Sequence, residues 1–352
     1  MTPPPERPIA VDAMGGDHAP DEIVAGAREA AERLGLSVLL VGRREDIDRA
    51  GGAGPCDVLE ASEVIAMDAD PAQSVRRLKD SSMVRAAEAV RLGSASAMVS
   101  AGNTGAAMAS ALLRMGRIRG VARPAIATPI PEPGGHVTVL IDSGANADCS
   151  PEWLVQFAQM GAVFVEERYG RPKPRIGLLS IGEEPSKGNE QVKTAHKLLR
   201  TCADEGLLPG DFVGNVEGRD LMSPVVDVVV CDGFTGNVAL KTLEGGMRAM
   251  VRGITEAFGA TDETRKAAEV LLPALAPMVE RLDPDNTGGA VLLGVKGVCV
   301  IAHGSSKRKA VVNAIKVAAE MVRAGMVERL EAAVSRLAPG GAREEQAADG
   351  AR

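Results

Sequence analysis

The sequence predicts an α/β fold with a mostly parallel sheet and helices on both of its faces. Short β-branched runs alternate with helical patterns along the 352 residues, which is typical of βαβ units. The strand candidates are continuous apolar runs, as expected when both faces of a sheet are covered. Glycine is abundant (40 residues) and only 2% of the chain is aromatic, so the core must be built from small and aliphatic side chains.

Eight segments carry the strand pattern, each followed by a turn rich in Gly, Asp, Asn or Ser, and residues 56–62 carry it more weakly. The eight are residues 9–20, 37–42, 96–105, 136–146, 175–189, 211–220, 225–237 and 298–306. Helical patterns lie between them, beginning at Pro20, at residue 71, near Thr104, Pro151, Asn189 and Gly236, and at Ser306, from which one long helix is expected to reach Leu337.

One segment does not fit the alternation. Residues 262–282 have a helical pattern with no strand nearby, and Pro273 and Pro277 are expected to interrupt it. We predict a helical excursion that protrudes from a single domain of residues 9–337. The Pro-rich residues 1–8 and the Ala/Gly/Glu-rich residues 338–352 are expected to be disordered.

Composition excludes several classes of protein. The net charge of −7 and the scarcity of aromatic residues argue against nucleic-acid binding. Five scattered cysteines without a CxxC pair are expected to be buried free thiols in a reducing cytoplasm. There is no signal peptide and no apolar stretch of about 20 residues. The protein is therefore expected to be soluble, or at most to lie on a membrane.

The chemistry is expected where the strands end. Six strand exits combine glycines with polar side chains, and if they share one edge of a parallel sheet they form a polar cleft able to hold phosphate. They are DAMGGDHAP, SAGNTG, DSGAN, GEEPSKGN, DGFTGN and AHGSS. None is a Walker A loop, and the chain lacks GxGxxG after its first strand, GxSxG and HExxH. We expect no metal and no cofactor.

Single residues in these exits have both a functional and a structural interpretation. Lys187 could bind phosphate or be a solvated loop lysine. His18 and His303 could orient a substrate or move a proton, or simply bond to their own loops. Asn103, Asn146 and Asn237 could hold a phosphate or an oxyanion, but Asn is also common in turns.

Taken together and in order, these motifs resemble one family. IAVDAMGGDHAP, SSMVRAAEAV, SAGNTGAAM, DSGAN, KGNE, FVGNVEGRD, VVVCDGFTGNVALKTLEG and AHGSS are similar to the bacterial phosphate acyltransferases of phospholipid synthesis, the PlsX family. The resemblance runs from about Ile9 to Leu330. It implies a three-layer α/β/α Rossmann-like sandwich, like isopropylmalate dehydrogenases and phosphotransacetylases, with a protruding helical hairpin.

The resemblance also implies an activity. Members of the family transfer a long-chain acyl group from acyl carrier protein to inorganic phosphate, and the acyl-phosphate then feeds a membrane glycerol-3-phosphate acyltransferase. The family's functional Lys and Asn fall on Lys187 and Asn237. Phosphate is itself a nucleophile, which accounts for the missing nucleophile elbow. His18, Asn103, Thr104, Asn146 and His303 are candidates for binding substrate in the same cleft.

Partner surfaces are predicted from charge and from the resemblance. An acidic carrier protein needs a basic patch, and the densest one holds Arg114, Arg117, Arg119 and Arg123; two other clusters are Arg76, Arg77, Lys79 and Arg85, and Lys307, Arg308 and Lys309. Family members are homodimers that associate peripherally with the inner face of the membrane, where Leu271, Leu272 and Leu275 would contact lipid, although core or dimer packing would also explain them. Two other functions fit the same features: an NAD-dependent isopropylmalate-type dehydrogenase and a non-catalytic protein that binds acyl carrier protein.

Overall fold

The structure is a computed structural model and describes residues 7–335. The disorder expected of residues 1–6 and 338–352 lies outside the described residues. Arg7 and Pro8 belong to the described chain: the Ser96 hydroxyl donates a hydrogen bond to the Arg7 carbonyl (3.0 Å), and the Ser96 N–H donates to the Pro8 carbonyl (2.9 Å).

Eleven described strands form one sheet. In chain order they are β1 (Ile9–Asp12), β2 (Val38–Gly42), β3 (Asp57–Glu60), β4 (Ala97–Ser100), β5 (Ala125–Pro131), β6 (Val137–Ile141), β7 (Arg175–Leu179), β8 (Asp211–Val216), β9 (Val228–Val230), β10 (Ala290–Leu293) and β11 (Val298–Ile301). Their order across the sheet is β3-β2-β1-β4-β11-β10-β5-β6-β9-β7-β8.

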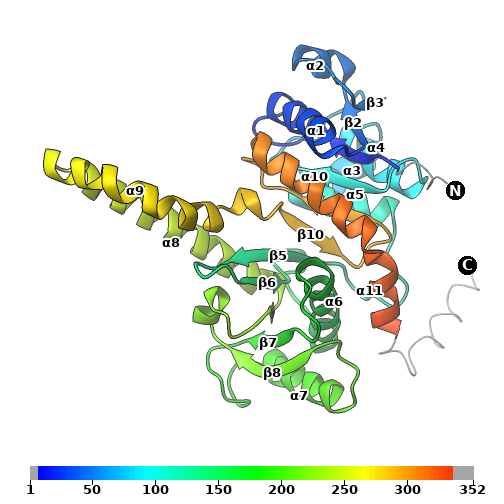
Figure 1. Cartoon of the computed structure of the whole chain (residues 1–352). Coiled ribbons are helices and arrows are strands. Elements are labelled where there is room, and N and C mark those ends of the chain that lie inside the picture. The colour runs from blue at the N-terminus through cyan, green and yellow to red at the C-terminus, as the bar shows by residue number, and fades with distance from the viewer. Residues whose placement is uncertain (1–6, 336–352) are drawn as a thin grey trace, which may run out of the picture.

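The sheet consists of two parallel groups that run in opposite directions. Strands β3, β2, β1, β4 and β11 are parallel to one another, and so are β6, β9, β7 and β8. Between the groups, β10 is antiparallel to both β11 and β5, and β5 is antiparallel to β6. These three reversals leave the two groups pointing in opposite directions, with β10 and β5 crossing the middle of the molecule (Figure 1).

Helices connect the strands and cover both faces. They are α1 (Asp21–Leu34), α2 (Arg44–Arg49), α3 (Pro71–Arg77), α4 (Ser82–Arg91), α5 (Thr104–Arg114), α6 (Pro151–Tyr169), α7 (Glu190–Asp204), α8 (Gly233–Gly259), α9 (Asp262–Leu282), α10 (Arg308–Arg323) and α11 (Met326–Ser335), with short 3-10 helices at Gly218–Met222 and Pro284–Asn286.

The core lies in layers on the two faces of the sheet. One large cluster joins alternate strand residues such as Ile9 and Val11 to α1, α6, α7, α10 and α11. On the other face, α3, α4 and α5 pack on the first group of strands, and the beginning of α8 packs on the second group through Leu240 and Leu243. These layers form the predicted α/β/α sandwich.

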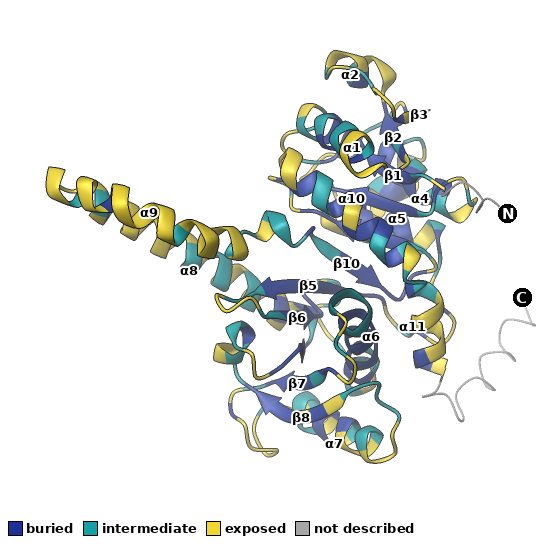
Figure 2. Cartoon of the chain, in the orientation of Figure 1, coloured by how far each residue is buried: buried dark blue, intermediate teal, exposed yellow. Residues whose placement is uncertain are grey.

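The predicted helical hairpin is present, and it is longer than the sequence indicated. It consists of α9 and the distal part of α8, and it protrudes from the sheet domain (Figure 1). Pro273 and Pro277 lie inside α9 without ending it; four residues apart, they leave their missing N–H groups on one side of the helix. Most of the hairpin is exposed (Figure 2). No helix within residues 7–335 combines the length and apolar composition needed to cross a membrane.

Two sequence predictions about elements were incomplete or wrong. Strands β5 and β10 were not predicted, because β5 contains Pro129 and Pro131 and β10 is followed directly by β11 without an intervening helix, which breaks the strand–helix alternation. The long helix expected after Ser306 is two helices, α10 and α11. Gly325 separates them with a φ of 63°, a left-handed conformation that ends α10.

Gly236 provides a test of how α8 is fixed to the sheet. A Cβ atom at Gly236 would lie 1.9 Å from the backbone oxygen of Asp142, so Gly236→Ala should lower the free energy of unfolding by about 1–3 kcal/mol. Gly246→Ala in the same helix is the matched control: a Cβ there meets nothing within 4 Å and should stabilise by up to about 1 kcal/mol. Urea unfolding measures both, and a Gly236→Ala variant as stable as the wild type would contradict the packing.

Candidate functional site

Three strand exits of the first group are held together around a buried aspartate. Asp12, at the end of β1, is 1% exposed and accepts hydrogen bonds from the Met14 N–H (3.2 Å) and the Ser100 hydroxyl (2.7 Å). Burial raises the pKa of Asp12, and these hydrogen bonds oppose the rise. The Asp17 N–H donates to the Gly304 carbonyl at 2.8 Å. The exits of β1, β4 and β11 therefore form one rigid cluster.

Four predicted substrate-binding residues lie in this first cluster. His18 and Thr104 are exposed. The Asn103 side chain is fully used by the fold: its oxygen caps α5 at the Ala106 N–H (2.9 Å), and its amide donates to the carbonyls of Met67 and Ala69. His303 is exposed, and its Nδ1 lies 2.7 Å from the Ser305 hydroxyl.

A second buried aspartate organises the exit of β6. Asp142 is 0% exposed and accepts hydrogen bonds from the backbone N–H groups of Ile126, Gly144, Ala145 and Asn146. Burial raises its pKa against the effect of these bonds. The Asn146 amide donates to Asp142 (2.9 Å) and to the Pro124 carbonyl (2.8 Å). Asn146 is thus a structural residue of this turn.

Asn237 lies on the first turns of α8, directly over this turn. Its Oδ1 would be 3.6 Å from a Cβ placed on Gly144. The turn and the helix start are bonded directly, because the Gly233 N–H donates to the Asn146 carbonyl at 2.7 Å. The Asn237 side chain is exposed and makes no hydrogen bond to another described residue. It differs in this from Asn103 and Asn146.

Lys187 lies in the loop after β7, and β7 is the strand next to β9 in the sheet. Its side chain is exposed and forms no ion pair within residues 7–335. Gly188 and Asn189, the next two residues, line a cavity of about 330 Å³ that also contacts Asp232 and Thr235 of the α8 start. Lys187 directly precedes Gly188, and Asn237 lies two residues after Thr235, so both are close in the chain to residues that line this cavity.

Two helices begin at this cavity. Asn189 caps α7 by accepting from the Val192 N–H (2.9 Å), and Asp232 caps α8 by accepting from the Thr235 N–H (2.7 Å). The N-terminus of a helix carries a positive partial charge that favours anions. With Lys187 next to Asn189, these helix ends favour phosphate at the mouth of the cavity, and the Asp232 carboxylate, which also lines it, opposes an anion.

The expectation that all six exits share one edge is wrong. The groups containing β1, β4, β11 and β6, β9, β7 run in opposite directions, so their exits leave the sheet in opposite directions. The pairing through β10 and β5 nevertheless places Ile141, the last residue of β6, level with Val300 of β11. The structure links the two groups of exits through α8, since Lys241 Nζ lies 3.5 Å from Nε2 of His303. Lys241 also pairs with Glu244 (2.9 Å). Lys241 was not predicted as a site residue, because it lies inside a helix and not in a strand exit. Its position four residues after Asn237 places it on the same helix face and could have indicated it.

The cysteines near the site are poor nucleophiles. Burial raises the pKa of Cys149 to about 12 and that of Cys231 well above its ordinary value. Both thiols stay protonated at neutral pH, and thiolate chemistry requires the opposite shift. Within residues 7–335, no three His, Cys, Asp or Glu side chains gather as metal ligands.

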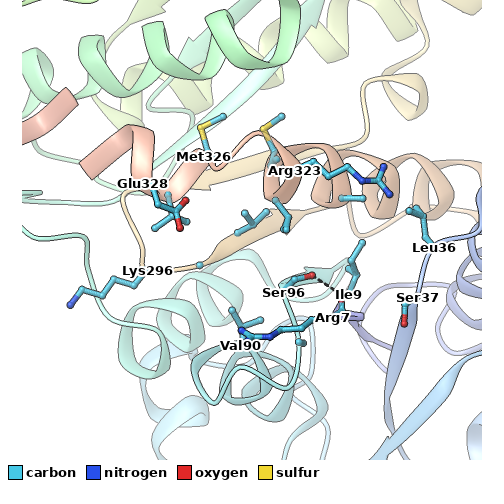
Figure 3. A pocket seen from close by; sticks show the side chains of 17 residues that line it. Arg7, Ile9, Leu36, Ser37, Val90, Ser96, Lys296, Arg323, Met326 and Glu328 are labelled. Carbon is cyan, nitrogen blue, oxygen red and sulfur yellow. Dashed lines mark hydrogen bonds between the residues drawn. The ribbon is translucent and has the colours of Figure 1, made fainter. Parts of the chain in front are cut away.

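A larger cavity, about 500 Å³, lies away from these residues. Arg7, Ile9 and Ser96 line it from the amino ends of β1 and β4, and Lys296 and Glu328 line it from the segments before β11 and within α11 (Figure 3). It is at the end of these strands opposite to their exits. None of the predicted site residues lines it.

Of the predicted carrier-docking arginines, Arg114 ends α5, and Arg117, Arg119 and Arg123 lie in the segment between α5 and β5. Arg117 donates to the carbonyls of Val121 and Ala122, so it holds the turn together. The Arg123 guanidinium lies 5.0 Å from the centre of the Trp153 ring. Arg114 is half-buried and Arg119 is exposed. The segment leads into Pro124, which contacts Asn146, so it borders the same turn as Asn237.

Solved structures show where this architecture occurs. The EutD phosphotransacetylase from Staphylococcus aureus matches with a TM-score of 0.59 at 16% identity, over 90% of this chain and 94% of that one. A branched-chain phosphotransacylase from Enterococcus faecalis matches with a TM-score of 0.56 at 15% identity, over 89% and 98%. These similarities show the fold, an α/β/α sandwich that also occurs in phosphotransacetylases.

Sequence comparison identifies the family. Residues 8–329 match the family model described as fatty acid synthesis protein. The chain is 47% identical to a phosphate acyltransferase of Desulforudis audaxviator, over 97% of this chain and 99% of that protein. It is 48% identical to one of Heliobacterium modesticaldum, over 94% and 98%. The chain belongs to the phosphate acyltransferase family, as its motifs predicted.

The different uses of two asparagines can be measured. Asn103→Ala removes a helix cap and should lower the free energy of unfolding by about 1 kcal/mol. Asn237→Ala removes a side chain without a partner among the described residues and should change that free energy by less than about 0.5 kcal/mol. Urea unfolding of the two variants compares them, and equal losses would mean that Asn237 also serves the fold.

Proposed function

We propose that this chain transfers a long-chain fatty acyl group from acyl carrier protein to inorganic phosphate, giving an acyl-phosphate for phosphatidic acid synthesis. The observation that carries the proposal is the cavity mouth at two helix N-termini, with Lys187 and Asn237 close in the chain to residues that line it. Family membership supports the same acceptor, since the relatives are named phosphate acyltransferases. The dehydrogenase alternative shares only the fold.

The chemistry requires positioning rather than an activated side chain. A phosphate oxygen attacks the thioester carbonyl carbon, the carbonyl oxygen becomes an oxyanion, and the carrier thiolate leaves as the acyl-phosphate forms. Lys187 and the two helix ends hold the phosphate, and Asn237 orients the phosphate or donates to the developing oxyanion. Neither Cys149 nor Cys231 is needed, because phosphate supplies the nucleophile.

The direct test is release of free carrier-protein thiol from palmitoyl–acyl carrier protein, with and without inorganic phosphate. Strictly phosphate-dependent release, with a product that hydroxylamine traps, supports acyl-phosphate synthesis. Release without phosphate would indicate a thioesterase instead. No release at all would favour a non-catalytic carrier-binding protein.

Removal of Asn237 should separate activity from stability. Asn237→Ala is expected to lower turnover about 10²–10³-fold, the range found when one oxyanion donor is lost. Lys187→Ala should chiefly raise KM for phosphate. Initial rates over a phosphate series measure both effects, and Asn103→Ala serves as the control because its amide faces the fold. An Asn237→Ala variant with most of its activity would remove this residue from the mechanism.

Carrier-protein docking is proposed at the segment holding Arg114, Arg117, Arg119 and Arg123, because it borders the turn beneath Asn237. Arg119→Glu is the cleanest variant, since Arg117 also holds its own turn. We expect KM for the carrier substrate to rise about fivefold, equivalent to about 1 kcal/mol, with kcat unchanged. Arg44→Glu, at the far end of the sheet, is the matched control. An unchanged KM would exclude this patch.

Peripheral membrane association is proposed for the hairpin. Leu271 and Leu272 are 50% and 54% exposed, whereas Leu275 is half-buried, so lipid contact falls chiefly on the first two. The Leu271→Glu, Leu272→Glu double variant should lose flotation with anionic liposomes. A Leu92→Glu, Val225→Glu double variant, also altered at exposed apolar residues, should float like the wild type. Equal flotation of all three proteins would reject this role.

The remaining proposals rest on family membership. We place the chain in the cytoplasm at the inner face of the membrane, as a homodimer that delivers acyl-phosphate to a membrane glycerol-3-phosphate acyltransferase. The proposed reaction needs no cofactor.

A further inference from the structure

The cavity beside Lys187 and Asn237 differs in character between its mouth and its floor. Asn189, Asp232 and Thr235 are polar and lie where α7 and α8 begin. The floor is apolar, and its lining side chains are Leu154, Leu178, Leu179, Val192 and Cys231. Phosphate is bound by hydrogen-bond donors and positively charged groups, so the apolar floor would not contribute to binding phosphate.

We propose that this apolar floor binds the first part of the substrate's acyl chain and thereby sets the enzyme's preference for long chains. This inference rests on the proposed acyl transfer. The reacting carbonyl would lie at the mouth, beside Lys187 and Asn237, with the chain running down between α6 and α7. The volume of about 330 Å³ is at the lower end for small-molecule sites, so it accommodates part of a long chain.

Three observations support an acyl chain as the occupant. Leu154, Leu178 and Cys231 are each less than 5% exposed, so the apolar floor is continuous with the hydrophobic core. Ile181 also lines the cavity yet is 81% exposed, which leaves an apolar side chain at the rim where a longer chain emerges. The lining also includes Gly188, which directly follows Lys187 in the chain.

A fourth observation concerns the mouth. The Ser180 hydroxyl lines the cavity and is buried without a hydrogen-bond partner among the described residues. Buried polar atoms are normally satisfied. A thioester carbonyl or phosphate oxygen placed at the mouth would accept from it, so the same cavity offers a donor at one end and an apolar floor at the other.

Narrowing the floor should change chain-length preference. Val192 is half-buried at the start of α7, and Val192→Phe fills part of the cavity. We expect the ratio of kcat/KM for hexadecanoyl to kcat/KM for butanoyl thioester to fall at least tenfold, since each methylene excluded costs about fourfold. The assay is phosphate-dependent thiol release by the full chain. Val213→Phe, the same change at an exposed residue of β8, should leave the ratio unchanged.

A second variant keeps the proposal testable if Val192→Phe does not fold. Ile181→Ser alters only an exposed rim residue and should lower kcat/KM for hexadecanoyl several-fold without affecting butanoyl transfer. An equal loss for both chain lengths, or no change in either variant, would overturn the acyl-floor inference. Wild-type protein that turns over neither thioester would instead overturn the proposed function, and this is seen before any variant is assayed.

Discussion

The geometry of the site depends on one buried carboxylate, Asp142. Its two oxygens collect four backbone N–H groups and the amide of Asn146, which converts the end of β6 into a tight turn. The bond from Ile126 ties that turn to β5, and the neighbouring Gly233–Asn146 bond ties it to α8. An unpaired carboxylate in such a place would be costly, and here hydrogen bonds offset the burial.

Asp12 organises the strand exits in the other half of the sheet in the same way. It ends β1 as Asp142 ends β6, is buried to nearly the same degree, and bonds to a side chain of a neighbouring strand. Each half of the molecule thus builds its exit cluster on one aspartate. The two clusters differ in the helices that begin at them: the first cluster leads into helices packed on the sheet, whereas the second leads into α8, which continues into the hairpin.

The sequence predicted the layers, nine of the eleven strands and the hairpin, because those features depend on local apolar pattern. It did not predict β5 and β10. Two prolines in β5 contradict the strand pattern, and β10 runs into β11 without the helix that the strand–helix alternation leads one to expect. Both segments are strands because neighbouring strands pair with them. Since these two strands reverse the second half of the sheet, missing them also led to the wrong expectation of six exits on one edge. The sequence predicted which residues could belong to the site, but not which of them hold the fold together. Asn103, Asn146 and Asn237 look alike in sequence. Only the tertiary structure shows that the side chains of Asn103 and Asn146 make hydrogen bonds within the fold.

The length of α8 has a mechanical consequence. Its 27 residues make a rod about 40 Å long, with Asn237 near one end, Lys241 against His303 one turn further, and the hairpin tip at the other end. The sheet holds only the first turns, and the rest projects from the domain with α9 packed along it (Figure 1). A straight rod clamped near one end acts as a lever, so a force on the tip, such as contact with a surface, is transmitted to the turn that carries Asn237 and to the loop that carries His303. In this chain, one continuous helix both reaches toward a surface and positions the reacting groups.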